Sequence, residues 1–324
     1  MKKAFLLAFL FSTLAQSSTL RFDFPEVRVG TAEYPQGPTG CTVFVFPKAY
    51  KGAIDIRGGA AAVRDGSALD PLNAYGVIDA LVFAGGSSYG LDAASGVMER
   101  FLQLKKGSTH FDDIPAVAGA VIYDFTGRNN NVFPDRKLGA EAFDVARANL
   151  VEIGRKGAGA NATVGKYFGR NYLESNGQGA AFLQRGPVKV FVLTVVNAVG
   201  NILDRKGNVI RGSLDPKSNT RFSIPEKLLN TPPDVEPHEV PKGNTTLTVL
   251  ITNVRLSRGD LQRLAVMAHT GMGRTIEPFS TPYDGDTFIA VTSDSVDLPA
   301  NMDIGDLGTL GVYAAQEAVL KSVP

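Results

Sequence analysis

Apolar runs of strand length alternate along the chain with segments of helical periodicity. Residues 77–86, VIDALVFAGG, and residues 114–125, IPAVAGAVIYDF, are nearly continuous apolar runs, the pattern of strands covered on both faces. Residues 90–104 instead place apolar side chains three and four positions apart, which predicts a helix with one buried face. Because doubly covered strands need helices on their faces, the pattern predicts an α/β protein built in layers.

The same alternation continues through the rest of the chain. Further strands are predicted from apolar runs at residues 27–46, 188–204, 247–253 and 286–293. Helices are predicted over Glu141–Gly154, after Ser257, whose hydroxyl can cap a first turn, and from Leu307 onward. Residues 211–243 are polar, contain six prolines and are predicted to form a long loop. Long loops inside compact domains are usually functional or disordered.

The first residues, MKKAFLLAFLFSTLAQSS, differ from all that follow. Two lysines precede a short apolar run, and small residues come next. This three-part pattern is that of a secretory signal peptide, with a frayed N-terminal helix as the alternative. The apolar run is shorter than the roughly 20 residues that a membrane-spanning helix needs. We therefore expect a signal peptide at residues 1–15, a single domain at residues 16–324, and export to the periplasm or the extracellular space.

Composition and charge narrow the expected partners and cofactors. The 324 residues carry a formal net charge of +1, which gives no electrostatic reason to expect nucleic acid or an anionic membrane as a partner. The 44% apolar and 20% charged residues are typical of a globular protein. Three scattered histidines and one cysteine offer no metal-ligand spacing, so neither a metal nor another cofactor is expected. Cys41 lies in an apolar run and is interpreted as a core residue.

The sequence GGSSYG contains the first candidate nucleophile. Residues 86–90 fit the G-x-S-x-G pattern between a strand and a helix, where a serine hydrolase holds its nucleophile. Ser88 would need His238 or His269 as its base, yet one falls in the proline-rich loop and the other on an apolar-faced helix. A glycine-rich turn without catalytic function is the alternative. A second glycine-rich stretch, GRKGAGANATVG at residues 154–165, lacks the ending of a phosphate-binding loop and is interpreted as lining a site.

The stretch KGNTTLTVLITNV, residues 242–254, contains the second candidate. Asn244 and Thr245 stand where the proline-rich loop ends and a strand begins, which a turn entering a strand would also explain. An N-terminal threonine is an activated nucleophile, because its own α-amine, with a reference pKa near ~7.7–8.0, can take the hydroxyl proton. To free that amine, the Thr245 hydroxyl would attack the Asn244 carbonyl, and water would hydrolyse the resulting ester. The domain would then consist of residues 16–244 and 245–324.

Motifs over nearly the whole mature chain resemble one known family. In order, they are VRVGTAE, DIRGGAAAVRDGSALDP, AGGSSYGLDAASGVMERF, GAGANATVG, VVNAVGN, NTTLTVLITN, LAVMAHTGMGRTIEP and YDGDTFIA. From about Val27 to Ala318 the chain resembles the DmpA-type self-processing aminopeptidases, which include L-aminopeptidase/D-esterases and β-peptidyl aminopeptidases. The resemblance implies a four-layer αββα sandwich of the DmpA and ornithine-acetyltransferase type. It also implies cleavage into a larger and a smaller fragment, no cofactor, and a homo-oligomer, often a tetramer.

The resemblance assigns roles to the two residues at the expected cut and to an asparagine elsewhere. Thr245 matches the family nucleophile, and Asn244 matches the residue that is cut away. Asn197, in VVNAVG, matches an oxyanion-hole donor, a role that suits an amide NH₂. A plain backbone contact at a strand end is the alternative for Asn197.

Three further residues receive roles in the same way. Tyr123, in VIYDF, matches a tyrosine that assists the reaction, with a core aromatic as the alternative. Asp284 and Asp286, in DGD, match a polar pair that orients the nucleophile, with a simple hairpin turn as the alternative. Some members carry serine and glutamate there. Carboxylates beside an α-ammonium would hold it and shift its pKa.

One position departs from the family pattern. Aminopeptidase members often carry a glutamate two residues before the tyrosine, where it grips the free amine of the substrate, and this chain has Val121 there. Amides, esters and lactam-like compounds therefore join free-amine peptides as possible substrates. The sequence predicts an exported, self-cleaving N-terminal-threonine hydrolase of small peptide or amino-acid amides and esters. The rivals are a serine esterase using Ser88 and a non-catalytic exported binding protein that kept the fold.

Overall fold

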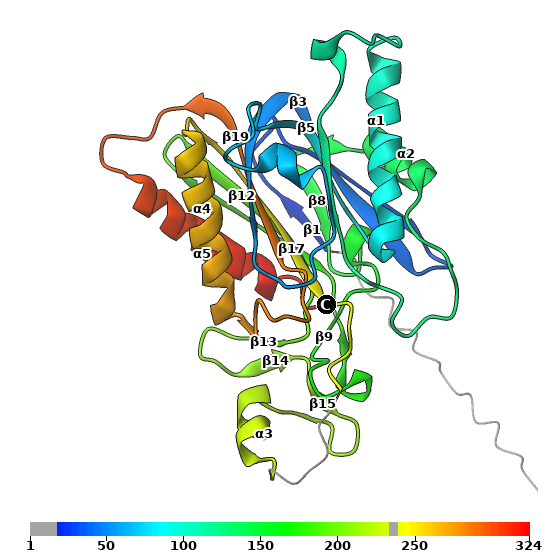
Figure 1. Ribbon diagram of the computed structural model, residues 1–324. Helices are drawn as coiled ribbons and strands as arrows, with labels where there is room; N and C mark the ends of the chain where they lie inside the picture. The colour runs from blue at the N-terminus through cyan, green and yellow to red at the C-terminus, as the bar shows by residue number, and fades with distance from the viewer. Residues whose placement is uncertain (1–17, 233–238) are drawn as a thin grey trace, which may run out of the picture.

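Ten strands form one continuous mixed sheet that helices cover on two sides (Figure 1). The main path is β11-β12-β17-β19-β3-β5-β6-β4, with β2 and β7 branching from β3; the pairs β17–β19 and β5–β6 are parallel and the others antiparallel. The ten strands are β2 (Arg28–Tyr34), β3 (Thr39–Ile56), β4 (Val63–Arg64), β5 (Val77–Ala84), β6 (Val117–Val121), β7 (Arg147–Ala148), β11 (Gln178–Arg185), β12 (Val188–Asn197), β17 (Thr245–Val254) and β19 (Thr287–Val296).

Among the residues that the structure describes, smaller sheets and five α-helices complete the fold. The small sheets are β1 (Ser18–Arg21) with β8 (Leu150–Ile153), β9 (Thr163–Val164) with β10 (Glu174–Ser175), β13 (Asn201–Leu203) with β14 (Val209–Arg211) and β18 (Ile276–Glu277), and β15 (Leu214–Asp215) with β16 (Thr220–Arg221). The helices are α1 (Ala93–Leu104), α2 (Arg136–Asp144), α3 (Ile224–Asn230), α4 (Arg258–Gly271) and α5 (Ile304–Leu320). In Figure 1, β13, β14 and α3 extend below the ends of β12 and β17.

The structure is a computed structural model that describes residues 18–232 and 239–324. The signal peptide expected at residues 1–15 and the candidate base His238 lie outside the described residues. Within those two ranges, none of the helices is both long enough and apolar enough to span a bilayer.

Three separate hydrophobic cores show how the layers stack. The first lies between the two halves of the folded sheet and includes Phe44, Phe83 and Phe191. The second packs α4 and α5 against β11, β12, β17 and β19, and the third packs α1 and α2 against β2, β3, β5 and β6. Figure 1 accordingly shows α1 and α2 on one side of the strands and α4 and α5 on the other. This order of helices, sheet, sheet and helices confirms the predicted αββα sandwich.

Strand β3 joins the two halves of the sheet because it is long enough to belong to both. Its residues 41–45 pair with β5, its residues 51–56 pair with β19, and the register shifts between Val45 and Tyr50. The first part of β3 is buried on both faces, as expected for a strand between two cores. Cys41 lies there with its side chain fully buried, which confirms the interpretation as a core residue.

The predicted helix over Glu141–Gly154 is wrong for all residues after Asp144. The helix, α2, begins five residues earlier, where Asp135 accepts a hydrogen bond from the Leu138 N–H, and it ends at Asp144. Asn149 then adopts a left-handed backbone with φ of 62°, which breaks the helical path. The following residues form β8, which pairs with β1. The apolar spacing of these residues also fits a helix, but their pairing with β1 decides the conformation. That partner strand is more than 120 residues away in the sequence, so local spacing does not reveal it.

The predicted long loop at residues 211–243 contains more regular structure than expected. It holds β15, β16 and α3, whose first turn is capped by the Ser223 hydroxyl and contains Pro225 where a proline fits. Arg221 forms two hydrogen bonds with the buried Glu174, which ties this segment to β10. The part of this segment that leads into α3 is therefore anchored to the rest of the domain through Arg221.

The elements around Thr245 agree closely with the predictions. Strand β17 begins at Thr245 itself, and all ten of its residues are buried, because it lies between β12 and β19. Helix α4 follows, with the Ser257 hydroxyl accepting a hydrogen bond from the Asp260 N–H at 3.1 Å, as the capping pattern predicted. The candidate nucleophile thus sits at the first position of a central strand.

Candidate active site

The pairing of β12 with β17 brings Asn197 opposite Thr245. These residues are partners in the antiparallel register, at the end of one strand and the start of the other. Asn197 is fully buried and Thr245 is 6% exposed. Two residues that are 48 positions apart in the sequence therefore meet because the strands align at this end of the sheet.

Hydrogen bonds surround the peptide group that joins Asn244 to Thr245. The Thr245 hydroxyl donates a hydrogen bond to the Asn244 carbonyl oxygen, and the Gly285 N–H donates to the same oxygen at 2.8 Å. The Asn244 side-chain amide donates to the carbonyls of Pro241 at 2.7 Å and Tyr283 at 3.2 Å. The hydroxyl thus lies next to the carbonyl group that self-cleavage would attack, and that carbonyl is already polarised by a backbone donor.

The two predicted aspartates flank Gly285 and face the start of β17. Asp286 accepts the Thr246 N–H at 2.6 Å with one carboxylate oxygen and the Ser280 N–H at 2.9 Å with the other. Asp284 forms a parallel bridge with Asn244. The DGD sequence is therefore more than a hairpin turn, because it contacts the backbone on both sides of the Asn244–Thr245 bond, at Asn244 and at Thr246.

Burial raises the pKa of both aspartates. Asp284 accepts the Val199 N–H at 3.0 Å and the Thr281 hydroxyl at 2.6 Å, yet its burial raises the pKa above the ordinary value. Burial raises the pKa of Asp286 well above its ordinary value, and repulsion from Asp284 raises it further. The pair therefore holds protons at a higher pH than exposed carboxylates do.

The side chain of Asn197 has a fixed orientation. Its Oδ1 accepts the Thr163 N–H at 3.0 Å and the Lys166 ammonium at 3.0 Å. Its Nδ2 donates to the carbonyls of Tyr123 at 3.2 Å and Gly243 at 3.3 Å. The NH₂ group therefore points toward the chain that precedes Thr245.

Tyr123 packs against that same chain. Gly243 has a φ of 89°, and a Cβ there would lie 2.7 Å from the Tyr123 ring, so glycine is required on both counts. The Tyr123 carbonyl is held by Asn197, while its ring faces a pocket. The structure thus brings together all six sequence-predicted site residues: Asn244, Thr245, Asn197, Tyr123, Asp284 and Asp286.

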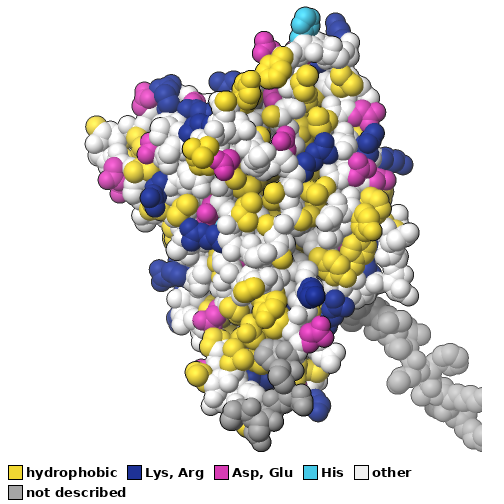
Figure 2. Space-filling model, in the orientation of Figure 1, with side chains coloured by type: hydrophobic (Ala, Val, Ile, Leu, Met, Phe, Trp, Pro, Cys, Tyr) yellow, Lys and Arg dark blue, Asp and Glu magenta, His cyan; other side chains and the backbone are white. Residues whose placement is uncertain are grey.

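The pocket has a volume of about 910 Å³ and includes Tyr123, whose ring lies against Gly243 in the chain before Thr245. Its lining is formed by Ser87, Ser88, Tyr89, Tyr123, Phe125, Asn130, Asn131 and Phe133. None of the described residues that line the pocket has a charged side chain. Figure 2 shows hydrophobic side chains gathered at the lower end of α1, while acidic and basic side chains are interspersed over the rest of that face. The pocket is therefore suited to an uncharged, partly apolar ligand.

Comparison with known proteins identifies the family. Residues 22–324 match the sequence model of Peptidase family S58. The chain belongs to this family. It is a hydrolase of peptidase family S58, whose members include self-processing amidohydrolases and aminopeptidases, and the resemblance stated from the motifs is confirmed.

Relatives of this S58 member support the assignment. A 6-aminohexanoate-oligomer endohydrolase of Kocuria sp. (strain KY2) is 41% identical over 285 residues, covering 87% of this chain and 77% of that protein. An uncharacterized aminopeptidase of Mycobacterium bovis is 36% identical over 275 residues, covering 80% and 75%.

Solved structures share the fold of this S58 member. The L-aminopeptidase D-Ala-esterase/amidase of Ochrobactrum anthropi superposes with a TM-score of 0.64 at 19% identity, covering 92% of this chain and 82% of that one. A β-aminopeptidase of Burkholderia sp. gives a TM-score of 0.62 at 17% identity, covering 95% and 86%.

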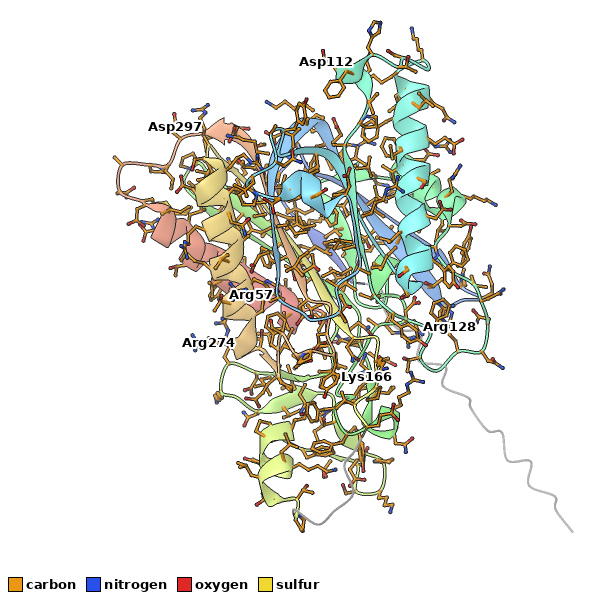
Figure 3. The ribbon with its side chains drawn as sticks, viewed as in Figure 1. Arg57, Asp112, Arg128, Lys166, Arg274 and Asp297 are labelled. Atoms are coloured by element: carbon orange, nitrogen blue, oxygen red, sulfur yellow. The ribbon has the colours of Figure 1, made fainter. Side chains whose placement is uncertain are left out.

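Sequence reasoning missed Lys166 of this S58 member. Its side chain is buried, and its Nζ donates to the backbone carbonyl and to Oδ1 of Asn197 at 3.1 and 3.0 Å. Burial lowers the pKa of Lys166 from 10.5 to about 7, although the nearby Asp284 opposes this shift. Figure 3 shows Lys166 at the lower end of the strands. A signal was present, because Lys166 directly follows the glycine-rich residues 154–165 that were expected to line a site.

The described residues of this S58 member place no histidine against Ser88. Ser88 is exposed in a 3₁₀ turn that leads into α1, and it lines the same pocket as Tyr123. His269 is buried on α4, where its ring nitrogen bonds Asp55 at 2.9 Å. In the described part of the chain, no histidine forms a hydrogen bond with Ser88. Among the described residues, Ser88 therefore has no histidine partner that could remove its proton.

Val121 does not face the pocket. Its side chain is buried in the core beneath α1 and α2. Neither this position nor the pocket lining supplies a carboxylate for a substrate amine, within the residues that the structure describes. In those same ranges, no group of three or more histidine, cysteine, aspartate or glutamate side chains is arranged to hold a metal ion.

Proposed function

We propose that the protein is an exported N-terminal-threonine amidohydrolase that cuts its own chain between Asn244 and Thr245. The observation that carries the proposal is the position of the Thr245 hydroxyl against the Asn244 carbonyl, whose oxygen accepts the Gly285 N–H at 2.8 Å. Membership of Peptidase family S58 supports it.

Self-cleavage proceeds by transfer of an acyl group from nitrogen to oxygen. The Thr245 hydroxyl oxygen bonds to the Asn244 carbonyl carbon, while the Gly285 N–H stabilises the negative charge on the carbonyl oxygen. The hydroxyl proton passes to the amide nitrogen as the carbon–nitrogen bond breaks, which leaves an ester and a free α-amine. Water hydrolyses the ester to a carboxylate at Asn244 and restores the Thr245 hydroxyl.

The freed threonine then acts on substrate. Its α-amine takes the hydroxyl proton as the oxygen attacks the substrate carbonyl, and it passes the proton to the departing amine. Departure of the preceding chain removes Gly243 from Asn197, so one Nδ2 hydrogen becomes available for the substrate oxyanion. Asp286 holds the start of β17 in place by accepting the Thr246 N–H, and Asp284 lies beside it across Gly285. Water finally releases the acyl group from Thr245.

The pocket favours substrates that are uncharged around the scissile bond. Its aromatic rings and amide side chains suit methylene groups and amides, and it lacks a carboxylate to hold an ammonium group. The relative from Kocuria is named for endohydrolysis of 6-aminohexanoate oligomers. We therefore include internal amide bonds of flexible oligoamides among the substrates, beside small peptide and amino-acid amides and esters.

Two further parts of the proposal concern the cell and the assembly. The basic start and short apolar run of residues 1–15 support export to the periplasm or the extracellular space. The family resemblance supports a homo-oligomer, often a tetramer. Cell fractionation and light scattering of the purified protein test these two expectations separately.

A pair of variants separates the threonine nucleophile from the serine alternative. Thr245→Ala is expected to give one uncut band on a denaturing gel and no hydrolysis of 6-aminohexanoate oligomers or amino-acid amides. Ser88→Ala is expected to self-cleave and to keep most of its activity. Full activity of Thr245→Ala, or complete loss in Ser88→Ala with cleavage intact, would assign the reaction to Ser88. No cleavage and no activity in the unmodified protein would favour the non-catalytic binding protein.

A further inference from the structure

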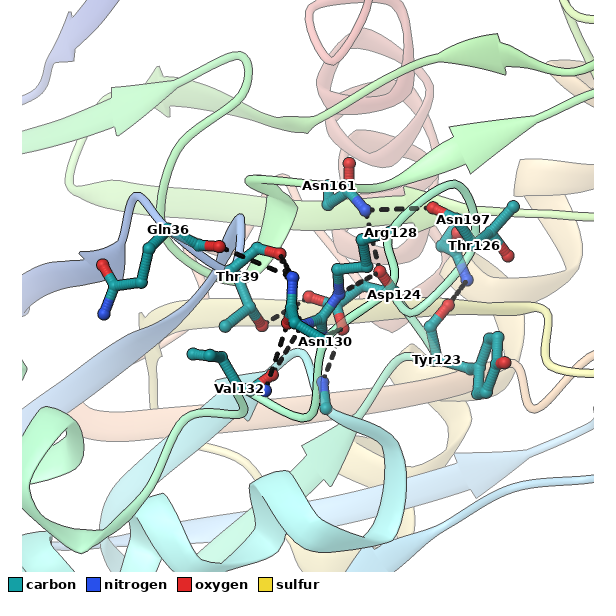
Figure 4. Close-up of polar contacts among 12 residues, drawn as sticks. Gln36, Thr39, Tyr123, Asp124, Thr126, Arg128, Asn130, Val132, Asn161 and Asn197 are labelled. Carbon is teal, nitrogen blue, oxygen red and sulfur yellow. Dashed lines mark hydrogen bonds and ion pairs between the residues drawn. The ribbon is translucent and has the colours of Figure 1, made fainter.

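A buried ion pair directly follows Tyr123 and has no part in the reaction proposed above. Asp124 and Arg128 are joined at 2.6 Å, and their side chains are 0% and 3% exposed. Two opposite charges this deeply buried are costly unless each finds several further partners. Figure 4 shows that both do: Asp124 contacts other segments of the chain, and Arg128 contacts the backbone and side chains of its own loop.

Asp124 ties its segment to the elements beneath the pocket. One carboxylate oxygen accepts the Gly86 N–H at 2.8 Å, and the other accepts the Thr39 hydroxyl at 2.5 Å. Its backbone carbonyl accepts the Asn161 side-chain amide at 2.8 Å. Asp124 therefore connects the turn before α1, the start of β3 and the glycine-rich residues 154–165.

Arg128 closes the loop that begins at Asp124. Its Nε donates to the Asp124 carbonyl at 2.9 Å, and its Nη1 donates to the Val132 carbonyl at 2.5 Å and to Asn130 Oδ1 at 2.8 Å. The guanidinium also lies 4.1 Å from the centre of the Phe125 ring. One planar side chain thus holds both ends of residues 124–132 together, which a single-point donor such as lysine cannot do.

The loop held in this way forms one wall of the pocket beside Thr245. Phe125, Asn130, Asn131 and Phe133 all line the pocket and belong to this loop or follow it directly. The Asn130 amide is occupied by the Gly37 carbonyl at 2.7 Å and by Arg128, so it braces the wall. The position of this wall therefore depends on the ion pair.

We propose that the Asp124–Arg128 pair is a positioning device that fixes this wall and so determines how tightly substrate is held, while taking no part in bond making. The inference rests on the proposed function, because it assumes that substrate occupies this pocket. The two charged groups form an ion pair with each other, and Arg128 also donates hydrogen bonds to backbone carbonyls of the loop. The pair can therefore order an uncharged pocket without offering a charge to the ligand.

Arg128→Lys is the sharpest test, because lysine keeps the positive charge beside Asp124 but loses the hydrogen bonds that the guanidinium donates to Val132 and Asn130. With linear 6-aminohexanoate oligomers as probe, we expect KM to rise by about tenfold or more and kcat to change by less than about threefold. Self-cleavage should proceed as in the unmodified protein. Arg100→Lys is the matched control, because Arg100 forms a similar two-point contact with Asp144 on the surface between α1 and α2. Its KM should not change.

A second measurement does not depend on catalysis. Chymotrypsin should cut after Phe125 at least about tenfold faster in Arg128→Lys and Arg128→Gln than in Arg100→Lys, since cleavage follows local opening. Mass spectrometry identifies the cut. Equal cleavage in all variants, or a fall in kcat at unchanged KM, would overturn the positioning role. If the unmodified protein hydrolyses no probe, the proposed substrate class fails, and the chymotrypsin result alone decides the role of the pair.

Discussion

At the scale of single residues, the account depends on how buried polar atoms around Thr245 are partnered. Motif resemblance could place Asn197, Asp284 and Asp286 at the site, because each lies in a short characteristic sequence. It could not show that the Lys166 ammonium donates a hydrogen bond to the Asn197 side chain. That contact arises only when residues 163–166 fold against the end of β12. Such packing of one loop on a strand end leaves no periodic pattern in the sequence.

The titration of Lys166 gives a prediction at this scale. The unfolded chain keeps the lysine proton up to a pKa near 10.5, whereas the folded chain releases it at about 7. Between these values unfolding takes up a proton, so the folded state gains stability as pH rises, by at most about 1.4 kcal/mol per pH unit. Urea unfolding of the uncut Thr245→Ala protein from pH 7 to 10 should show this gain relative to Thr245→Ala/Lys166→Met.

The double variant serves as the reference because every other titrating group is shared. Parallel stability curves for the two proteins over this range would mean that Lys166 titrates at its ordinary pKa in the folded state.

At the scale of elements, strands and helices with strong local signals could be predicted, and those defined by distant partners could not. Strand β17 and helix α4 follow from an apolar run and a serine cap. Strand β8 does not, because its pairing with β1 decides its conformation and the same residues also fit a helical spacing. The strand order could not be predicted either, since β17 lies between β12 and β19 through pairings that no local pattern specifies.

Gly285 lies just before β19 and gives a prediction at the scale of elements. A Cβ at this position would lie 2.7 Å from the Thr245 hydroxyl and 2.8 Å from the Ala60 carbonyl, so alanine must displace the nucleophile or the loop. Because misplacing a reacting group by about 1 Å can cost about 100-fold in rate, Gly285→Ala should slow self-cleavage by that order. Time-resolved gels of freshly made protein measure the rate.

Gly259→Ala is the matched control for this substitution. Gly259 lies near the start of α4, where a Cβ would meet nothing closer than the Ser257 hydroxyl at 3.8 Å. Alanine there should leave the cleavage rate unchanged. Normal cleavage in Gly285→Ala would show that the Thr245 hydroxyl does not need its observed position.

At the scale of the whole molecule, the cut would fall inside a continuous sheet rather than between domains. Strand β17 of the smaller fragment pairs with β12 of the larger from Thr245 to Thr252, and β19 pairs with β3. Both fragments also contribute side chains to the two cores that β17 touches. None of these pairings or core contacts runs through the Asn244–Thr245 bond.

We therefore predict that the cut fragments stay together under native conditions. They should elute as one peak in size-exclusion chromatography and separate only in denaturant, because separation would expose the apolar faces of a central strand. Two native peaks of the fragment sizes would contradict the proposed continuity of the sheet after cleavage.

The central claim is that the Thr245 hydroxyl becomes the nucleophile once the Asn244–Thr245 bond is broken. Mass spectrometry of the purified, active protein tests it most directly. The account predicts two fragments, of which the smaller begins at Thr245 and ends at Pro324. Active protein that consists of one polypeptide continuous through Thr245, or that is cut at another bond, would contradict it.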